Sequence, residues 1–237
     1  MVGKTSLLTE ILCEKEQFGT RIEQLVYIYT MEDSNIARLR KKYSKNGLFL
    51  REIPNNLPEI LLPGGRACLV IDDKEDDIVG SKDKTWIVSD LVKIYKHHSK
   101  ILMFLLLQSY DCFMKKNPLN PAVQNCEKLI LFRSMSNFTS LKRWLNGYCI
   151  RLKGNQTLYE VYKEHILADR FAYLIIDLSH DLKSPRVYSH ILHNDKRPLI
   201  VFSIEPDEIE WCLEYVCRRI LMVWSALYKK ESCFHHH

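Results

Sequence analysis

Two stretches that are apolar at almost every position constrain the fold of this chain most. They are the runs 67–73 (ACLVIDD) and 100–108 (KILMFLLLQ). Continuous apolar character is typical of a strand buried on both faces, as in a parallel sheet, and not of a strand with one face in solvent. Three more strands are predicted, and they are 25–30 (LVYIYT), 128–133 (KLILFR) and 172–178 (AYLIIDL).

Helical patterns lie between these strands. They are predicted over 5–11, 34–43, 89–98, 139–148 and 157–168, and a long amphipathic helix is predicted over 207–230. Helices that alternate with buried strands predict an α/β layered domain with a mostly parallel central sheet. We expect this core to occupy residues 1–206 and an amphipathic helix and tail to occupy 207–237, where the apolar stripe of the helix packs on the core or on a neighbouring subunit.

Composition indicates an intracellular globular protein. The chain has 237 residues, 46% of them hydrophobic, and a formal charge of +5. It carries neither a signal-peptide pattern nor an apolar run long enough to cross a bilayer, so we expect no membrane partner. Its eight cysteines show no CxxC pair, which favours free thiols in a reducing compartment such as a host cytoplasm or nucleus and argues against secretion. The final three histidines read as a possible tag remnant and carry no functional argument.

The triplet Gly3-Lys4-Thr5 matches the second half of a phosphate-binding loop, GxxxxGK[ST]. In such a loop backbone N–H groups surround the phosphates, the lysine reaches the β and γ oxygens, and the hydroxyl binds Mg²⁺. The loop leads into a helix whose N-terminus favours anions, and the sequence from Thr5 fits one. We therefore predict that Gly3, Lys4, Thr5 and Ser6 contact ATP and that Thr5 also contacts Mg²⁺.

Polar residues follow the two apolar runs. A phosphate-loop enzyme needs a carboxylate at the end of a neighbouring buried strand to hold Mg²⁺, a role that suits Asp72, while Asp73 would orient or deprotonate the attacking water. Gln108 ends the next strand, where ligand-facing residues of open α/β sheets gather, and would contact the γ-phosphate. The alternatives are that Asp72 and Asp73 merely begin an acidic turn and that Gln108 begins a surface loop.

These motifs, in this order, resemble the FtsK–HerA superfamily of P-loop ATPases, and more specifically the genome-packaging ATPases of large DNA viruses and of Maverick/Polinton-type elements. The likeness runs from Gly3 to about Asp195. Two later segments lie outside the general nucleotide motifs and resemble this family in particular. They are KLILFRS at 128–134 and the stretch 157–192, which contains a helix with a tyrosine, a strand ending in Asp and a downstream Arg.

The resemblance implies a RecA/FtsK-like P-loop fold that hydrolyses ATP with Mg²⁺ to move double-stranded DNA into a capsid. It also implies a homo-oligomeric ring and capsid proteins as further partners. The basic run 38–42 would then contact the DNA backbone, and its alternative is a solvated helix face. No NKxD motif is present, which counts against a signalling GTPase.

Two departures from the family pattern matter. The first half of the loop and the strand before it would precede Met1, so we expect a truncated core whose first strand is missing. The alternative function is a degenerate, non-catalytic relative that acts as a binding or assembly module. The family's Pro-Arg-Asp after the fourth strand is replaced by residues 135–137 (MSN), so an arginine finger would pass to Arg133 or Arg143, or be lost.

Overall fold

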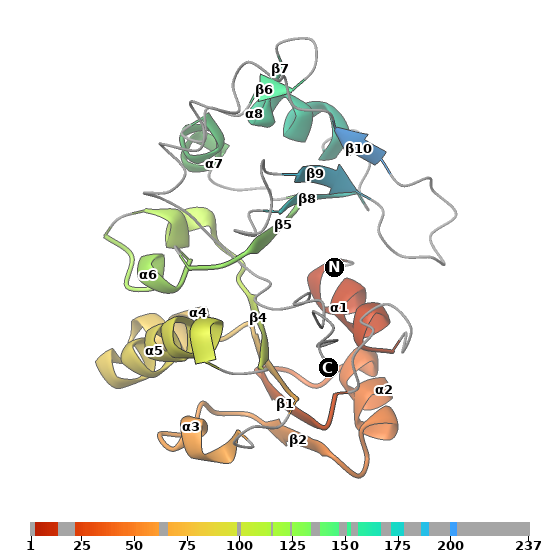
Figure 1. Cartoon of the computed structure of the whole chain (residues 1–237), viewed down its shortest axis with the longest axis vertical. Helices are drawn as coiled ribbons and strands as arrows, with labels where there is room; N and C mark the ends of the chain where they lie inside the picture. Colours follow the sequence, from red (N-terminus) through yellow and green to blue (C-terminus); the bar gives the residue numbers. More distant parts are fainter. Residues whose placement is uncertain are drawn as a thin grey trace, which may run out of the picture.

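The computed structural model describes most of the chain up to Phe202 (Figure 1). The described residues are 3–13, 22–61, 66–98, 101–114, 116–123, 125–133, 138–146, 151–152, 156–166, 172–177, 186–189 and 200–202. The helix predicted at 207–230, the segment 135–137 and the terminal histidines lie outside them. Among the described helices, none combines the length and the apolar character that a membrane crossing requires.

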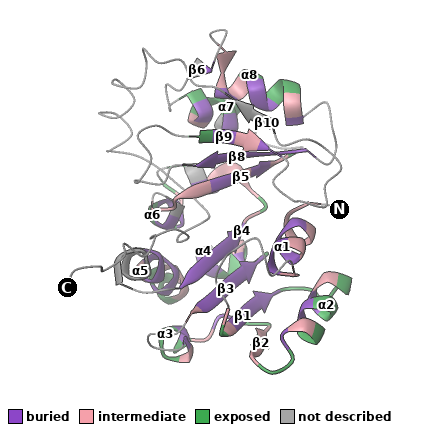
Figure 2. Ribbon diagram, turned by 45° about the vertical axis from the view of Figure 1, so that its right-hand side comes forward, coloured by how far each residue is buried: buried purple, intermediate pink, exposed green. Residues whose placement is uncertain are grey.

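The first half of the chain builds a parallel sheet in the strand order β2-β1-β3-β4. Its strands are β1 (Gln24–Tyr29), β2 (Gly47–Leu50), β3 (Ala67–Asp72) and β4 (Leu102–Leu106). Every residue of β3 and of β4 is buried (Figure 2), as the two apolar runs predict. The register pairs Tyr29 of β1 with Asp72 of β3, and Asp72 with Leu106 of β4, so these strands end together at one edge of the sheet.

Helices cover both faces of this sheet, which makes a three-layer α/β domain. The helices are α1 (Lys4–Cys13), α2 (Ser34–Lys42), α3 (Leu57–Ile60), α4 (Glu75–Val79) and α5 (Lys82–His98). Alternate residues of the strands face opposite layers. Leu25 and Val70 pack with α1 and α2 in one cluster, whereas Val26 and Leu69 pack with α5 in the other. Figure 1 shows these two helical layers on either side of the strands.

The second half of the chain forms an antiparallel sheet in the order β10-β9-β8-β5. Its strands are β5 (Lys128–Phe132), β8 (Tyr173–Asp177), β9 (Arg186–Ser189) and β10 (Ile200–Phe202). Helical turns and a short hairpin accompany it, namely η1 (Tyr110–Phe113), α6 (Asn120–Val123), α7 (Phe138–Asn146), β6 (Arg151–Leu152), β7 (Gln156–Thr157), α8 (Leu158–Val161) and η2 (Tyr162–Ile166). Leu174 and Ile175 of β8 belong to the two different core clusters, so both apolar layers continue from one sheet into the other.

An apolar cleft lies between the two sheets. It is lined by α1, β4 and β5, and the last two are the edge strands that face each other across it. The hydroxyl of Tyr110, just beyond β4, donates to the carbonyl of Phe132 at the end of β5 (2.7 Å), so both strands end on the same side. Gly3 lies at this end of the cleft, because a Cβ added to it would be 3.4 Å from the Phe132 ring.

The sequence predictions are confirmed for the α/β class and for a parallel sheet. They are wrong about the direction of the strands in the second half of the chain, where β5 pairs with β8 in antiparallel orientation. The apolar character of a strand indicates that the strand is buried. It does not indicate whether the strand runs parallel or antiparallel to its neighbour, because that depends on the connection between the two strands. The alternative reading of Asp72 and Asp73, an acidic turn, applies only to the first residues after β3, because Glu75–Val79 forms α4 with three acids in its first turn, where the helix dipole favours them.

Candidate functional site

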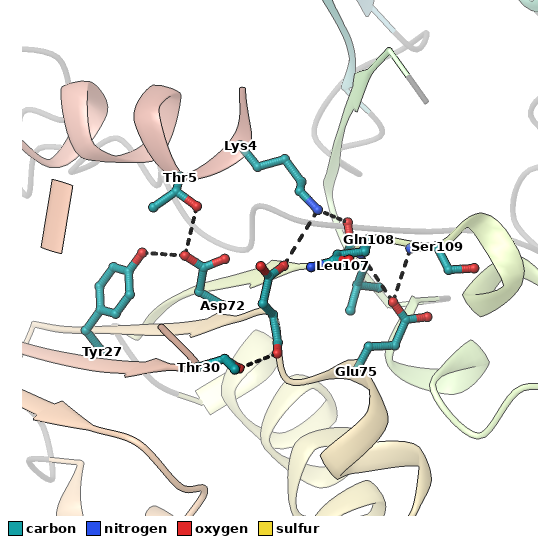
Figure 3. Close-up of polar contacts among 10 residues, drawn as sticks. Lys4, Thr5, Tyr27, Thr30, Asp72, Glu75, Leu107, Gln108 and Ser109 are labelled. Carbon is teal, nitrogen blue, oxygen red and sulfur yellow. Dashed lines mark hydrogen bonds and ion pairs between the residues drawn. The ribbon is translucent and has the colours of Figure 1, made fainter. Parts of the chain in front are cut away.

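The first turn of α1 lies over the carboxyl edge of the parallel sheet (Figure 3). The N–H groups of a first helical turn have no backbone partner within the helix. The first backbone hydrogen bond of α1 runs from Leu7 N to Gly3 O (2.9 Å). Ser6, on the same turn, accepts a long bond from Asn35 Nδ2 (3.5 Å). The residues predicted to contact ATP, Gly3 to Ser6, are therefore together at the positive end of a ten-residue helix.

Asp72 connects this turn to the sheet. Its Oδ2 accepts hydrogen bonds from Thr5 Oγ1 (2.9 Å) and from Tyr27 Oη (2.8 Å). Its Oδ1 is buried and, among the described residues, has no hydrogen-bond partner. Burial raises the pKa of the Asp72 carboxyl, and the bonds from Tyr27 and Thr5 oppose that rise. A buried acceptor left without a donor is costly, so this oxygen is suited to a ligand that supplies positive charge.

Lys4 and Asp73 lie beside this pair. Lys4 Nζ donates to the carbonyl of Leu107 (2.7 Å) and is 3.8 Å from Asp73 Oδ1. Burial lowers the pKa of Lys4, and the neighbouring carboxylates of Asp73 and Asp72 act against it. The Asp73 side chain is 41% exposed, so its carboxylate is accessible to water. Its backbone has φ 55°, the left-handed region, and the Thr30 hydroxyl donates to its carbonyl (2.6 Å).

Glu75 organises the neighbouring turn. Its Oε2 accepts hydrogen bonds from the backbone N–H groups of Gln108 and Ser109, both at 3.2 Å. Burial raises the pKa of Glu75, and these two bonds oppose the rise. The Gln108 side chain itself is exposed. The structure therefore brings Gln108 to the same edge as Lys4 and Asp73 through its backbone, with its amide in solvent.

A divalent cation fits this arrangement. Mg²⁺ is held by one or two protein oxygens together with waters and substrate phosphates, so it needs no cage of side chains. In the described part of the chain no cluster of three or more His, Cys, Asp or Glu is placed to hold a metal. The buried Oδ1 of Asp72 and the hydroxyl of Thr5, the two residues predicted from the sequence, are the oxygens here that could hold such an ion.

Sequence reasoning missed Tyr27 and Glu75. Tyr27 reads as one aromatic residue of an apolar strand, and only the pairing of β1 with β3 brings its hydroxyl to Asp72. Glu75 reads as part of an acidic turn, yet it is the acceptor that fixes the backbone after β4. The signal that could have found Glu75 is its place in the first turn of a short helix directly after Asp73.

Three side chains of the basic run 38–42 form ion pairs or hydrogen bonds within the molecule. Arg38 pairs with Glu10, Arg40 pairs with Glu32 at 3.0 Å, and Lys42 donates to the carbonyl of Leu12 at the end of α1 (2.6 Å). These contacts join α2 to α1 and to the segment that follows β1. None of the four cysteines in the described regions forms a disulfide.

Comparison with protein-family models, with curated proteins and with solved structures found no match.

Proposed function

We propose that this chain is an ATP-hydrolysing P-loop protein, and that it serves as a subunit of a DNA-translocating motor of the packaging type that its sequence resembles. One observation carries the first part of the proposal. Thr5 at the start of α1 and Asp72 at the end of β3 are 67 positions apart, yet they share a hydrogen bond of 2.9 Å, and Lys4 approaches Asp73 beside them. P-loop NTPases hold Mg²⁺ between a loop Ser or Thr and an Asp at the end of a neighbouring strand, which is the arrangement that this pair resembles.

Each residue then has a defined task. Thr5 and Asp72 would hold Mg²⁺, which supplies positive charge to the phosphates when bound. The ammonium of Lys4 would leave the Leu107 carbonyl to bind the β and γ oxygens. Asp73, the accessible carboxylate, would accept the proton of the attacking water. Gln108 would contact the γ-phosphate once its exposed amide turns toward the site.

The apolar cleft supports a P-loop identity for the fold. Two apolar edge strands, β4 and β5, face each other there and both end beside Gly3. Unpaired strand edges in an apolar setting are unfavourable because their backbone groups lack partners. A strand that ends at Gly3 would fit between them, in the place that the strand before a phosphate-binding loop takes in the architecture that the sequence resembles.

Nucleotide binding tests the first part of the proposal. A fluorescent ATP analogue with Mg²⁺ would be titrated into the chain as it stands and into a version that carries an apolar strand and a complete GxxxxGKT loop before Thr5. We expect much tighter binding in the second, because successive backbone N–H groups surround the β-phosphate. Failure of both to bind would reject the ATPase.

The motor is tested by its response to DNA. A DNA-translocating ATPase should hydrolyse faster with double-stranded DNA of any sequence, and added salt should reduce the stimulation steeply because phosphate contacts release counterions. Native mass and light scattering with nucleotide would show the ring. Stimulation by one sequence only, or stimulation that salt leaves unchanged, would argue against backbone tracking.

One observation favours the alternative of a non-catalytic relative. The Lys4 ammonium is already bonded to the Leu107 carbonyl and lies near Asp73, so its positive charge is partly balanced within the protein. In a binding or assembly module this contact would persist. A chain that binds Mg-ATP without hydrolysing it, and still associates with itself or with DNA, would support this alternative.

A further inference from the structure

Tyr27 carries a hydroxyl group into a buried, mostly apolar layer. Its side chain is fully buried, and its hydroxyl donates to Asp72 Oδ2 at 2.8 Å. It lies on β1 while Asp72 ends β3, so the contact crosses between neighbouring strands. A phenylalanine would fill the same apolar space, so the hydroxyl calls for an explanation beyond packing.

The ring of Tyr27 is held in place by its aromatic neighbours. Phe49 of β2 stacks on it with centroids 6.0 Å apart and planes at 19°, and Tyr29 meets it edge-on at 6.3 Å. Arg40 in turn lies over the Phe49 ring at 4.8 Å. Aromatic pairs of this kind stabilise a fixed geometry beyond the burial of their area. The hydroxyl therefore reaches Asp72 from a ring with little freedom to turn away.

The two donors to Asp72 choose the same oxygen. Thr5 Oγ1 and Tyr27 Oη both donate to Oδ2, while Oδ1 remains buried without a partner among the described residues. A carboxylate with no such contact can rotate and exchange its oxygens. Two donors on Oδ2 oppose that rotation and leave Oδ1 as the oxygen without a partner among the described residues.

We propose that Tyr27 is the positioning residue of Asp72, and that its hydroxyl fixes which carboxylate oxygen is presented to a divalent cation. This inference rests on the proposed function, since it assumes a cation at Asp72. If Thr5 turns its hydroxyl toward the cation, Tyr27 is left as the donor that keeps Oδ2 engaged. Groups that orient a metal ligand in this way typically contribute 10- to 100-fold in metal affinity.

The experiment measures binding of Mn²⁺, a paramagnetic substitute for Mg²⁺, to the full chain by electron paramagnetic resonance. Tyr27→Phe removes only the hydroxyl, and we expect the Kd for Mn²⁺ to rise about 10-fold. Tyr43→Phe is the matched control, because Tyr43 is also buried in this layer but donates to the Leu12 carbonyl (2.8 Å). Its Kd should stay within about twofold of the wild type, because its hydroxyl does not contact Asp72.

Circular dichroism and thermal unfolding establish that each variant is folded. A folded Tyr27→Phe chain that binds Mn²⁺ as tightly as the wild type would overturn the inference and leave the proposed function standing. A wild-type chain that binds no Mn²⁺ would overturn the cation site and the inference together.

A second measurement keeps the hydroxyl in place, in case Tyr27→Phe does not fold. Fluorotyrosine would be introduced at position 27 or at position 43 of the otherwise unchanged chain, and its ¹⁹F resonance followed as Mg²⁺ is added. The resonance at 27 should shift and that at 43 should not, because only the first hydroxyl contacts the ligand carboxylate. An unmoved resonance at 27 in a chain saturated with Mg²⁺ would contradict the inference.

Discussion

Asp72 and Asp177 each end a buried strand, one in the parallel sheet and one in the antiparallel sheet, and they are 5% and 6% exposed. Asp177 of β8 lies opposite Lys128 of β5, whose Nζ is 2.6 Å from Oδ2. Among the described residues, Asp72 of β3 receives hydrogen bonds only from hydroxyl groups, and no Lys or Arg forms an ion pair with it. The charge of Asp177 is therefore balanced by a lysine inside the fold, whereas the charge of Asp72 remains for a ligand.

The two surroundings follow from the two kinds of sheet. In the antiparallel pair the strands start and end beside each other, so the first residue of β5 meets the last residue of β8 and a lysine there neutralises the acid. In the parallel sheet all carboxyl ends lie at one edge, and acids from the strand ends gather near the start of a helix. That edge is where open α/β sheets place their ligands.

The largest expected effect concerns the accessible acid beside Asp72. Asp73→Asn, in a version with a complete loop, should reduce the rate of ATP hydrolysis about 100- to 10,000-fold, the usual contribution of a general base. Binding of Mg-ATP should change little, because the phosphate contacts remain. Steady-state hydrolysis and nucleotide titration measure the two quantities. Asp177→Asn is the control and should leave turnover unchanged, and normal turnover in Asp73→Asn would remove that residue from the chemistry.

The next effect separates binding from chemistry. Lys4→Ala should weaken Mg-ATP binding about 10- to 100-fold, because a charge-assisted bond to phosphate contributes roughly 1.5–3 kcal/mol. Titration with a fluorescent ATP analogue measures it. Lys74→Ala serves as the control, since Lys74 pairs with Asp77 at 2.9 Å on α4 instead of with the first turn of α1. Equal affinity in Lys4→Ala and the wild type would show that the lysine stays bonded within the protein.

The pair of Asp177 and Lys128 in the antiparallel sheet is tested by its effect on the free energy of unfolding. Asp177→Asn should lower the free energy of unfolding by about 2 kcal/mol, because Lys128 loses its charged partner in a mostly buried position. Denaturant unfolding of Asp177→Asn, Lys128→Met and the double variant gives the coupling between the two residues. Additive effects would show that the pair is not a unit and would weaken the contrast with Asp72.

The smallest effect is a pH dependence at Asp72. Because burial raises the folded-state pKa of this group above its unfolded value of about 3.9, the folded protein holds the proton more tightly. The stability that comes from this proton is complete below the unfolded pKa and is lost as pH rises through the folded pKa. Relative to the wild type, Asp72→Asn should therefore gain unfolding free energy as the pH rises above about 4. A difference that is constant over this range would mean that the pKa is not raised.

Much of the parallel sheet could be predicted from the sequence because its strands carry a strong local signal. The predicted strand at 67–73 is β3, and the predicted run at 100–108 contains β4.

A helix in the second half of the chain also carries a local signal. The predicted helix near 157–168 begins with a capping box between Thr157 and Glu160, and it continues as a π-helical turn from Tyr162. Such signals are local in sequence, which is why they can be seen without a structure.

The features that could not be predicted depend on contacts distant in sequence. β2 is only four residues long and begins at Gly47, which reads as a helix breaker. In the structure this glycine is needed for close packing, because an added Cβ would lie 2.7 Å from the Tyr43 carbonyl. The antiparallel pairing of β5 depends on a connection of 40 residues to β8. Within the candidate site, Gly3 to Ser6 could be singled out from a motif, but the contact of Tyr27 with Asp72 depends on the pairing of β1 with β3.

The left-handed backbone of Asp73 limits which acids this position can accept over evolutionary time. Asp and Asn enter that region more readily than other residues with a side chain, and a typical residue there costs about 1–2 kcal/mol. A change to Glu, which needs one nucleotide and keeps the charge, would therefore lengthen the carboxylate and strain the turn together. Sequences descended from this one can exchange Asp73 for Asn or Gly at little cost to the backbone, whereas a longer acid adds strain to the turn that follows β3.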